Sequence, residues 1–177
     1  MRKRLLIIVL VTAIVFFTIV LLIKINKGVY STYYFGDSGV SITVYNKFQA
    51  FDDDKIKTDV SLYNSELKTY IVGRDLPNNF WASGDMMANC DEYIRTISSM
   101  YYDRDFKDVD IELIKISGVE VGKVSMTVAQ KNSAYRTISL LFPSKNKNLI
   151  IEIYGDEKLV GENNDKLDTI ISGIKIK

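Results

Sequence analysis

The sequence predicts an α+β domain, an antiparallel sheet meander flanked by helices, preceded by one transmembrane helix. Three observations support this fold class. Residues 5–23 form an apolar run that contains no charged, amide or proline side chain. Farther along, apolar residues mostly alternate with polar ones, a period of two that is typical of half-buried strands. Two segments instead show the period of amphipathic helices.

The apolar run Leu5–Ile23 is long enough to cross a bilayer. As a helix it would extend about 28 Å, close to the hydrocarbon thickness of about 30 Å. A cleaved signal peptide usually has a shorter apolar region that ends in a small-residue cleavage site, whereas here Lys24 follows directly. An uncleaved signal anchor is therefore favoured over a cleaved signal. The basic residues before the run favour a cytoplasmic tail at residues 1–4 and a domain outside the cytoplasm.

In this division residues 24–33 are a juxtamembrane linker and residues 34–177 are the domain. Tyr30, Tyr33 and Tyr34 either lie at the membrane interface or begin the first strand. After Lys27 the chain has 18 Lys and Arg residues against 22 Asp and Glu residues, a formal charge of −4. An acidic domain is a poor partner for nucleic acid, because that binding depends on neutralising phosphates. No nucleic acid partner is expected.

The strands follow from the period of two and from the turn signals between them. The segment Gly36–Gly39 predicts a turn, and Gly73 closes an early strand. The last four strands have short connections, which permit only antiparallel neighbours because a parallel crossover needs a dozen or more residues. Strands are expected at residues 40–44, 60–62, 67–72, 111–116, 119–129, 135–142 and 149–154.

Two helices are expected on one side of this sheet. The first has Asn89 as its N-cap and Glu92 three residues later, a capping box. Its apolar face should bury Ile94 and Ile97, together with Cys90, Tyr93, Met100 and Tyr101. The second follows residues 163–165, carries Leu167, Ile170 and Ile171, and ends at Gly173 before an extended segment at 174–176.

This order of elements resembles the PsbP-like fold, which is named for the extrinsic photosystem II protein and is shared by many small bacterial extracytoplasmic domains. The similar segments are the helix at Cys90–Ile94, the meander after Gly118 and the closing segment Asp165–Ile176. The resemblance covers about residues 34–177. It implies an antiparallel sheet flanked by helices and usually a binding or assembly role without catalysis. It transfers no ligand residue to this chain.

Candidate catalytic groups are scarce. The sequence has no histidine, which removes the commonest general base and most zinc sites. Cys90, the only cysteine, lies on an apolar helix face, where a small core residue is the usual role. The segment Gly118–Gly122 lacks the spacing of a phosphate loop and is typical of the start of a hairpin strand. No catalytic residue and no cofactor are expected.

Two acidic runs are the candidates for a calcium site. The run Asp103–Glu112 begins with carboxylates at the first and third positions of a calcium loop, but Asp108 stands where the sharp turn needs glycine. Ile114 stands where the loop needs its bidentate glutamate. The second run is Asp52–Asp54. Solvated loops explain both runs, so no metal site is expected.

Phe80 and Trp81 are the candidate partner-binding residues, since an aromatic pair on a loop can anchor a partner; the alternative is a lid over one end of the core.

The favoured function is a non-catalytic, membrane-anchored domain that binds a protein or another cell-envelope partner. The alternative is a small-ligand or lipid-binding module with a pocket between sheet and helix, and an enzyme is the third class. A lined cavity of several hundred Å³ would favour the ligand hypothesis, and a filled core with an exposed aromatic patch the partner hypothesis.

Overall fold

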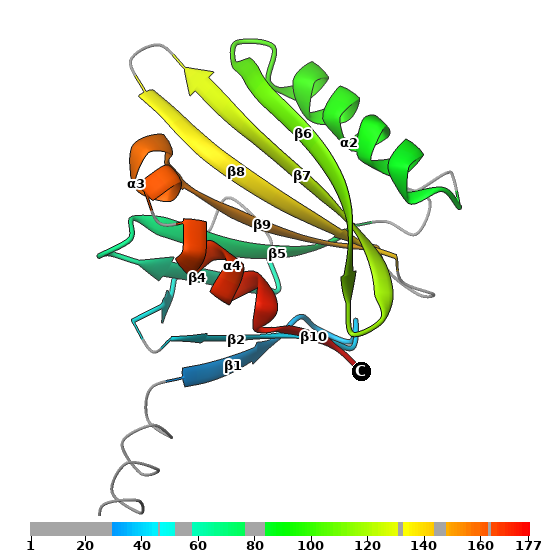
Figure 1. The fold of residues 1–177 in the computed structure, drawn as a ribbon, viewed down its shortest axis with the longest axis vertical. Helices are drawn as coiled ribbons and strands as arrows, with labels where there is room; N and C mark the ends of the chain where they lie inside the picture. The colour runs from blue at the N-terminus through cyan, green and yellow to red at the C-terminus, as the bar shows by residue number, and fades with distance from the viewer. Residues whose placement is uncertain are drawn as a thin grey trace, which may run out of the picture.

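The computed structural model describes residues 30–45, 47–51, 58–76, 84–130, 133–143, 148–162 and 164–177. Within these ranges the chain forms two antiparallel sheets and three helices (Figure 1). Three predicted features lie outside the described residues: the transmembrane helix at Leu5–Ile23, the acidic run Asp52–Asp54 and the pair Phe80 and Trp81. Of the helices that are described, none has the length and apolarity to span a bilayer.

The larger sheet has seven strands in the order β3-β4-β5-β9-β8-β7-β6. The last four strands in sequence are successive antiparallel neighbours, which confirms the predicted meander. β9 then pairs with β5, so the meander is joined to the earlier β-hairpin. The strands are β3 (Gln49–Ala50), β4 (Val60–Asn64), β5 (Thr69–Leu76), β6 (Asp105–Ile116), β7 (Val119–Gln130), β8 (Ser133–Phe142) and β9 (Asn148–Asp156).

The smaller sheet joins the two ends of the domain. Its three strands are in the order β1-β2-β10, with β1 at Tyr30–Tyr34, β2 at Val40–Tyr45 and β10 at Ile174–Ile176. The tyrosines at residues 30, 33 and 34 therefore belong to the first strand, the second of the two alternatives given above. Gly73 of β5 lets the two sheets approach closely, because a Cβ there would lie 2.1 Å from the Phe35 ring.

Helices cover both faces of the larger sheet, so the expectation of helices on one side was wrong. α2 (Met86–Met100) packs over β6 and β7 on one face (Figure 1). The opposite face carries the larger apolar cluster, which is covered by α3 (Glu157–Glu162), α4 (Asn164–Ser172) and the smaller sheet. The physical reason is alternation along each strand. On β9, for example, Ile151 and Ile153 belong to the larger cluster whereas Ile150 belongs to the cluster beneath α2.

α2 begins earlier than the capping box predicts. Its N-cap is Asp85, whose carboxylate accepts a hydrogen bond from the Met87 backbone N–H at 2.9 Å. Asn89 is a buried residue inside the helix, so its assignment as the N-cap was wrong. The apolar face in fact extends back to Met86, one turn before Cys90, and Met86 packs beneath the helix with it. Ile94 is only half-buried at the edge of this cluster, as is Ile97.

β6 begins at Asp105, so most of the acidic run Asp103–Glu112 is strand and not the solvated loop that was expected. The register of β6 against β7 shifts between Lys107 and Asp110, where Asp108 adopts a φ of 50°. A β-bulge explains this shift, because an extra residue on one strand bends it and breaks the alternation of side chains. The bulge interrupts the alternation of apolar and polar side chains from which a strand could have been predicted here.

The remaining elements differ in their ends. β5 covers Thr69–Leu76 instead of residues 67–72, because the Asn64 side chain accepts from the backbone N–H of Leu67 at 3.0 Å and holds a turn there. α4 and β10 lie where the closing helix and extended segment were predicted. The short helix α3 and the two-residue strand β3 were not predicted.

Candidate functional site

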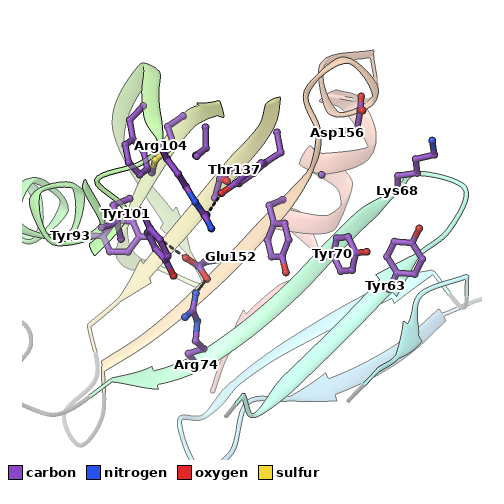
Figure 2. Close-up of a pocket in the computed structure, with 17 residues that line it drawn as sticks. Tyr63, Lys68, Tyr70, Arg74, Tyr93, Tyr101, Arg104, Thr137, Glu152 and Asp156 are labelled. Carbon is purple, nitrogen blue, oxygen red and sulfur yellow. Dashed lines mark hydrogen bonds and ion pairs between the residues drawn. The ribbon is translucent and has the colours of Figure 1, made fainter. Parts of the chain in front are cut away.

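A groove opens on the α2 face of the larger sheet, beside the helix (Figure 2). α2 covers β6 and β7, whereas no described helix covers the same face of β9, β5 and β4. The groove has a volume of about 580 Å³ and is bounded by the carboxyl half of α2, the start of β6 and the strands β4, β5, β8 and β9. We call it the tyrosine groove, because its lining includes Tyr63, Tyr70, Tyr93, Tyr101, Tyr135 and Tyr154.

Four of these tyrosines form a row across the strands. Tyr63 is paired with Tyr70 between β4 and β5, and Tyr70 is paired with Tyr154 between β5 and β9. The ring centroids of the two pairs are 4.5 and 5.1 Å apart, and the Tyr70 and Tyr154 rings are stacked. Tyr135 on β8 continues the row at 6.4 Å from Tyr154. Because stacked rings cover each other's faces, the row presents mainly ring edges and hydroxyl groups to the groove.

An ion pair lies at the centre of the groove. Arg74 of β5 donates to Glu152 of β9, and the Glu152 side chain is only 13% exposed. Burial acts to lower the pKa of Arg74, but the charge and hydrogen bond of Glu152 outweigh it, so that pKa is raised. The guanidinium of Arg74 therefore stays charged at neutral pH.

Tyr93 connects α2 to this ion pair. Its hydroxyl group donates to Glu152 Oε1 at 2.8 Å and lies 2.9 Å from Ser139 Oγ on β8. Burial is the main cause that raises the pKa of Tyr93 well above 10.0, and the nearby Glu152 charge acts in the same direction. The phenol is a fixed neutral donor that orients the carboxylate.

Arg104, between α2 and β6, provides the second guanidinium of the groove. Its Nη1 donates to Tyr135 Oη at 2.5 Å, and its guanidinium carbon lies 4.2 Å from the centroid of the Tyr101 ring. The buried Nε has no hydrogen-bond partner among the described residues, and none of their ion pairs includes Arg104. Burial raises the pKa of Tyr135, although the Arg104 charge opposes that shift.

Two further features bear on chemistry, the Cys90 thiol and the grouping of possible metal ligands. Cys90 is completely buried, and burial raises its pKa to about 11, so the thiol is protonated at neutral pH. Across the described ranges no three His, Cys, Asp or Glu side chains are grouped to hold a metal ion. The groove itself offers ring edges, hydroxyl groups and cations, which suit binding.

A second cavity of about 650 Å³ lies between the smaller sheet, the β4–β5 turn and α4. Its ion pair, Lys47 with Glu66, is largely exposed, and exposed pairs contribute little. The buried Asn64 in its wall already accepts from the backbone of the turn. The tyrosine groove, with its partly buried Arg74–Glu152 pair, is the stronger candidate site.

Phe80 and Trp81, the site residues predicted from the sequence, lie outside the described residues. The groove tyrosines were not singled out from the sequence. One available signal was the adjacency of Tyr and a core residue in three strands, at Leu62–Tyr63, Tyr70–Ile71 and Ile153–Tyr154. A strand that is apolar on both faces needs cover on both faces, or else it lines a cavity.

No protein-family model matches the sequence, and neither does a curated protein. Solved structures do match. The cyanobacterial PsbP protein (CyanoP) of Synechocystis sp. PCC 6803 superposes with a TM-score of 0.66 at 12% identity, covering 85% of this chain and 94% of that one. This chain has the PsbP-like fold. The fold predicted from the Cys90–Ile94 helix, the meander and the closing segment is thus confirmed.

The PsbP-like fold relates the chain to proteins of other kinds. The Ran-binding protein Mog1p of Saccharomyces cerevisiae has a TM-score of 0.57 at 11% identity, covering 83% of this chain and 95% of that one. A putative regulator from Pseudomonas aeruginosa has a TM-score of 0.50 at 12% identity, with 82% and 95% covered. At these identities the similarity shows the fold alone.

Proposed function

We propose that this protein is a non-catalytic, membrane-anchored binding protein whose extracytoplasmic domain takes up a ligand in the tyrosine groove. The observation that carries the proposal is the cavity of about 580 Å³ between the sheet and α2. Ligand sites are typically concave, about 300 to 1,000 Å³, and mostly apolar with a few fixed polar groups. The tyrosine row and the Arg74–Glu152 pair supply that combination.

The anchor in this proposal is supported by the sequence of Leu5–Ile23. Its length suits a bilayer, and the basic residues before it suit a cytoplasmic amino terminus. β1 begins at Tyr30, so only residues 24–29 separate the anchor from the folded domain.

A second candidate function is the capture of a protein partner at the cell envelope. It is supported by Mog1p, a Ran-binding protein that shares the fold. Phe80 and Trp81 remain the candidate contact residues for such a partner, and an aromatic pair of this kind is typical of binding hot spots.

Photo-crosslinking in native membranes would distinguish the two functions. A benzophenone amino acid would replace Tyr63 in the groove, Trp81 in the predicted contact loop, or Tyr34 on the smaller sheet as a control. We expect a small-molecule adduct at position 63 and none at position 34. A protein adduct at position 81 with none at position 63 would favour partner capture, and no adduct at position 63 would contradict a role for the groove.

A further inference from the structure

Arg104 has no acidic partner among the described residues, whereas the other guanidinium of the groove is paired. Arg74 is neutralised by Glu152, which is also held by Tyr93. Arg104 instead interacts with two tyrosines, through the hydrogen bond to Tyr135 and the contact with the Tyr101 ring. The charged side chains that line the groove are three cations (Lys68, Arg74 and Arg104) and two carboxylates (Glu152 and Asp156), which leaves one positive charge.

The guanidinium of Arg104 is held in place before any ligand arrives. Tyr101 lies against one side of it, and the Tyr135 hydroxyl accepts from Nη1. Nε is buried without a partner among the described residues, and Nη2 has no hydrogen bond to a described residue. Because Arg104 lines the groove, Nη2 is the donor that remains for a ligand there. A preorganised guanidinium of this kind binds a carboxylate or a phosphate oxygen well, since little side-chain entropy is lost.

The tyrosine row favours one kind of chemical group as the carrier of that anion. The edge of an aromatic ring is electropositive, and edges prefer to meet the face of another π-system. The row turns edges and hydroxyl groups toward the groove, because Tyr70 and Tyr154 stack face to face. A flat aromatic ring on the ligand therefore packs beside the row better than a bulky aliphatic group.

We infer that the tyrosine groove binds an aromatic anion, whose carboxylate or phosphate group is held by Arg104 and whose ring packs against the tyrosine row. This inference rests on the proposed function of the groove and adds the chemical class of its ligand. The attraction is strengthened because the cation lies in a recess where solvent screens it less.

Three matched probes test the inference on the full chain in nanodiscs, with binding measured by equilibrium dialysis: 2-naphthoate, 2-naphthyl phosphate and uncharged 2-naphthamide. We expect at least one anion to bind about tenfold or more tighter than the amide. Comparison of the two anions shows which group the site prefers. Empty nanodiscs correct for partition of the probes into lipid.

The variants assign any preference to Arg104. Arg104→Gln should reduce anion affinity to the level of the amide, and Arg104→Lys should retain part of the preference. Arg95→Gln is the matched control, because Arg95 is an exposed residue of α2 that pairs with Glu92 and does not line the groove. Thermal melts would confirm that each variant is folded.

The outcomes separate the two proposals. If all three probes bind equally and Tyr154→Ala weakens them equally, the groove is a binding site but the anion preference is refuted. An anion preference that survives in Arg104→Gln also refutes the inference. If wild type and Tyr154→Ala bind none of the probes above the level of empty nanodiscs, the inference fails, and the crosslinking at position 63 decides the proposed function by itself.

Discussion

Tyr93 joins three elements through one hydroxyl group. It lies on α2, donates to Glu152 of β9 and contacts Ser139 of β8. Removal of a buried donor leaves its partners with unpaired oxygens, at a cost of about 1–3 kcal/mol. We expect Tyr93→Phe to lower the melting temperature of the full chain, measured by circular dichroism. Tyr102→Phe is the control, since Tyr102 is 90% exposed, and an equal effect of the two changes would contradict the network.

Cys90 should make the domain sensitive to alkaline pH. Its thiol has a pKa of about 11 in the folded state instead of 9.0, because burial disfavours the thiolate. The folded state thus binds this proton more tightly, so its contribution to stability is complete below about pH 9 and is lost as the pH rises toward 11. Cys90→Ala should lose less stability than wild type between about pH 8 and pH 10.5 in denaturant titrations. If the stability of the two proteins fell in parallel as the pH rises, the expectation would be contradicted. Tyr93, whose pKa is also raised by burial, makes the stability of both proteins fall with rising pH in the same way.

At the scale of elements, the contact between α2 and β7 depends on a missing side chain. A Cβ at Gly122 would lie 2.4 Å from Cys90 Sγ and 3.2 Å from Met86 Sδ. Gly122→Ala should therefore destabilise the domain by about 1–3 kcal/mol through overpacking.

The double variant Gly122→Ala with Cys90→Ala should recover part of that loss, because the smaller side chain makes room for the new methyl group. Gly84→Ala is the control, as no atom of a described residue lies within 4 Å of the position that a Cβ would take there. Additive losses in the double variant, measured by urea denaturation, would show that α2 does not approach β7 at this point.

Elements were predictable where apolar and β-branched residues recur along a strand. β2 and β7–β9 follow from such runs, although the structure buries residues on both of their faces, and the apolar face of α2 follows from its helical period. The first half of β6 was not predictable from period, because its residues are mostly exposed and the bulge at Asp108 interrupts it. The groove was beyond sequence pattern for another reason. Tyr70 meets Tyr154 only because β5 pairs with β9, a register between segments far apart in the chain.

At the scale of the whole molecule, the proposed anchor gives a test of orientation. Protease added to intact protoplasts should digest the domain, because the basic residues before Leu5–Ile23 favour a cytoplasmic amino terminus. A cytoplasmic marker protein should survive the same treatment. A protected domain would contradict the orientation, and release into the supernatant by alkaline carbonate would contradict the anchor.

The pairing of β10 with β2 has a consequence for biosynthesis. Ile174 pairs with Ile42, so the smaller sheet needs segments from both ends of the domain. A ribosome makes β2 well before β10, and such long-range pairing is slow because the chain between must first be closed into a loop. Until β10 arrives, the edge of β2 is unpaired and open to chaperones or proteases. The smaller sheet is therefore completed only once β10 has been made, and a chain that lacks Ile174–Ile176 would keep that edge of β2 open to degradation.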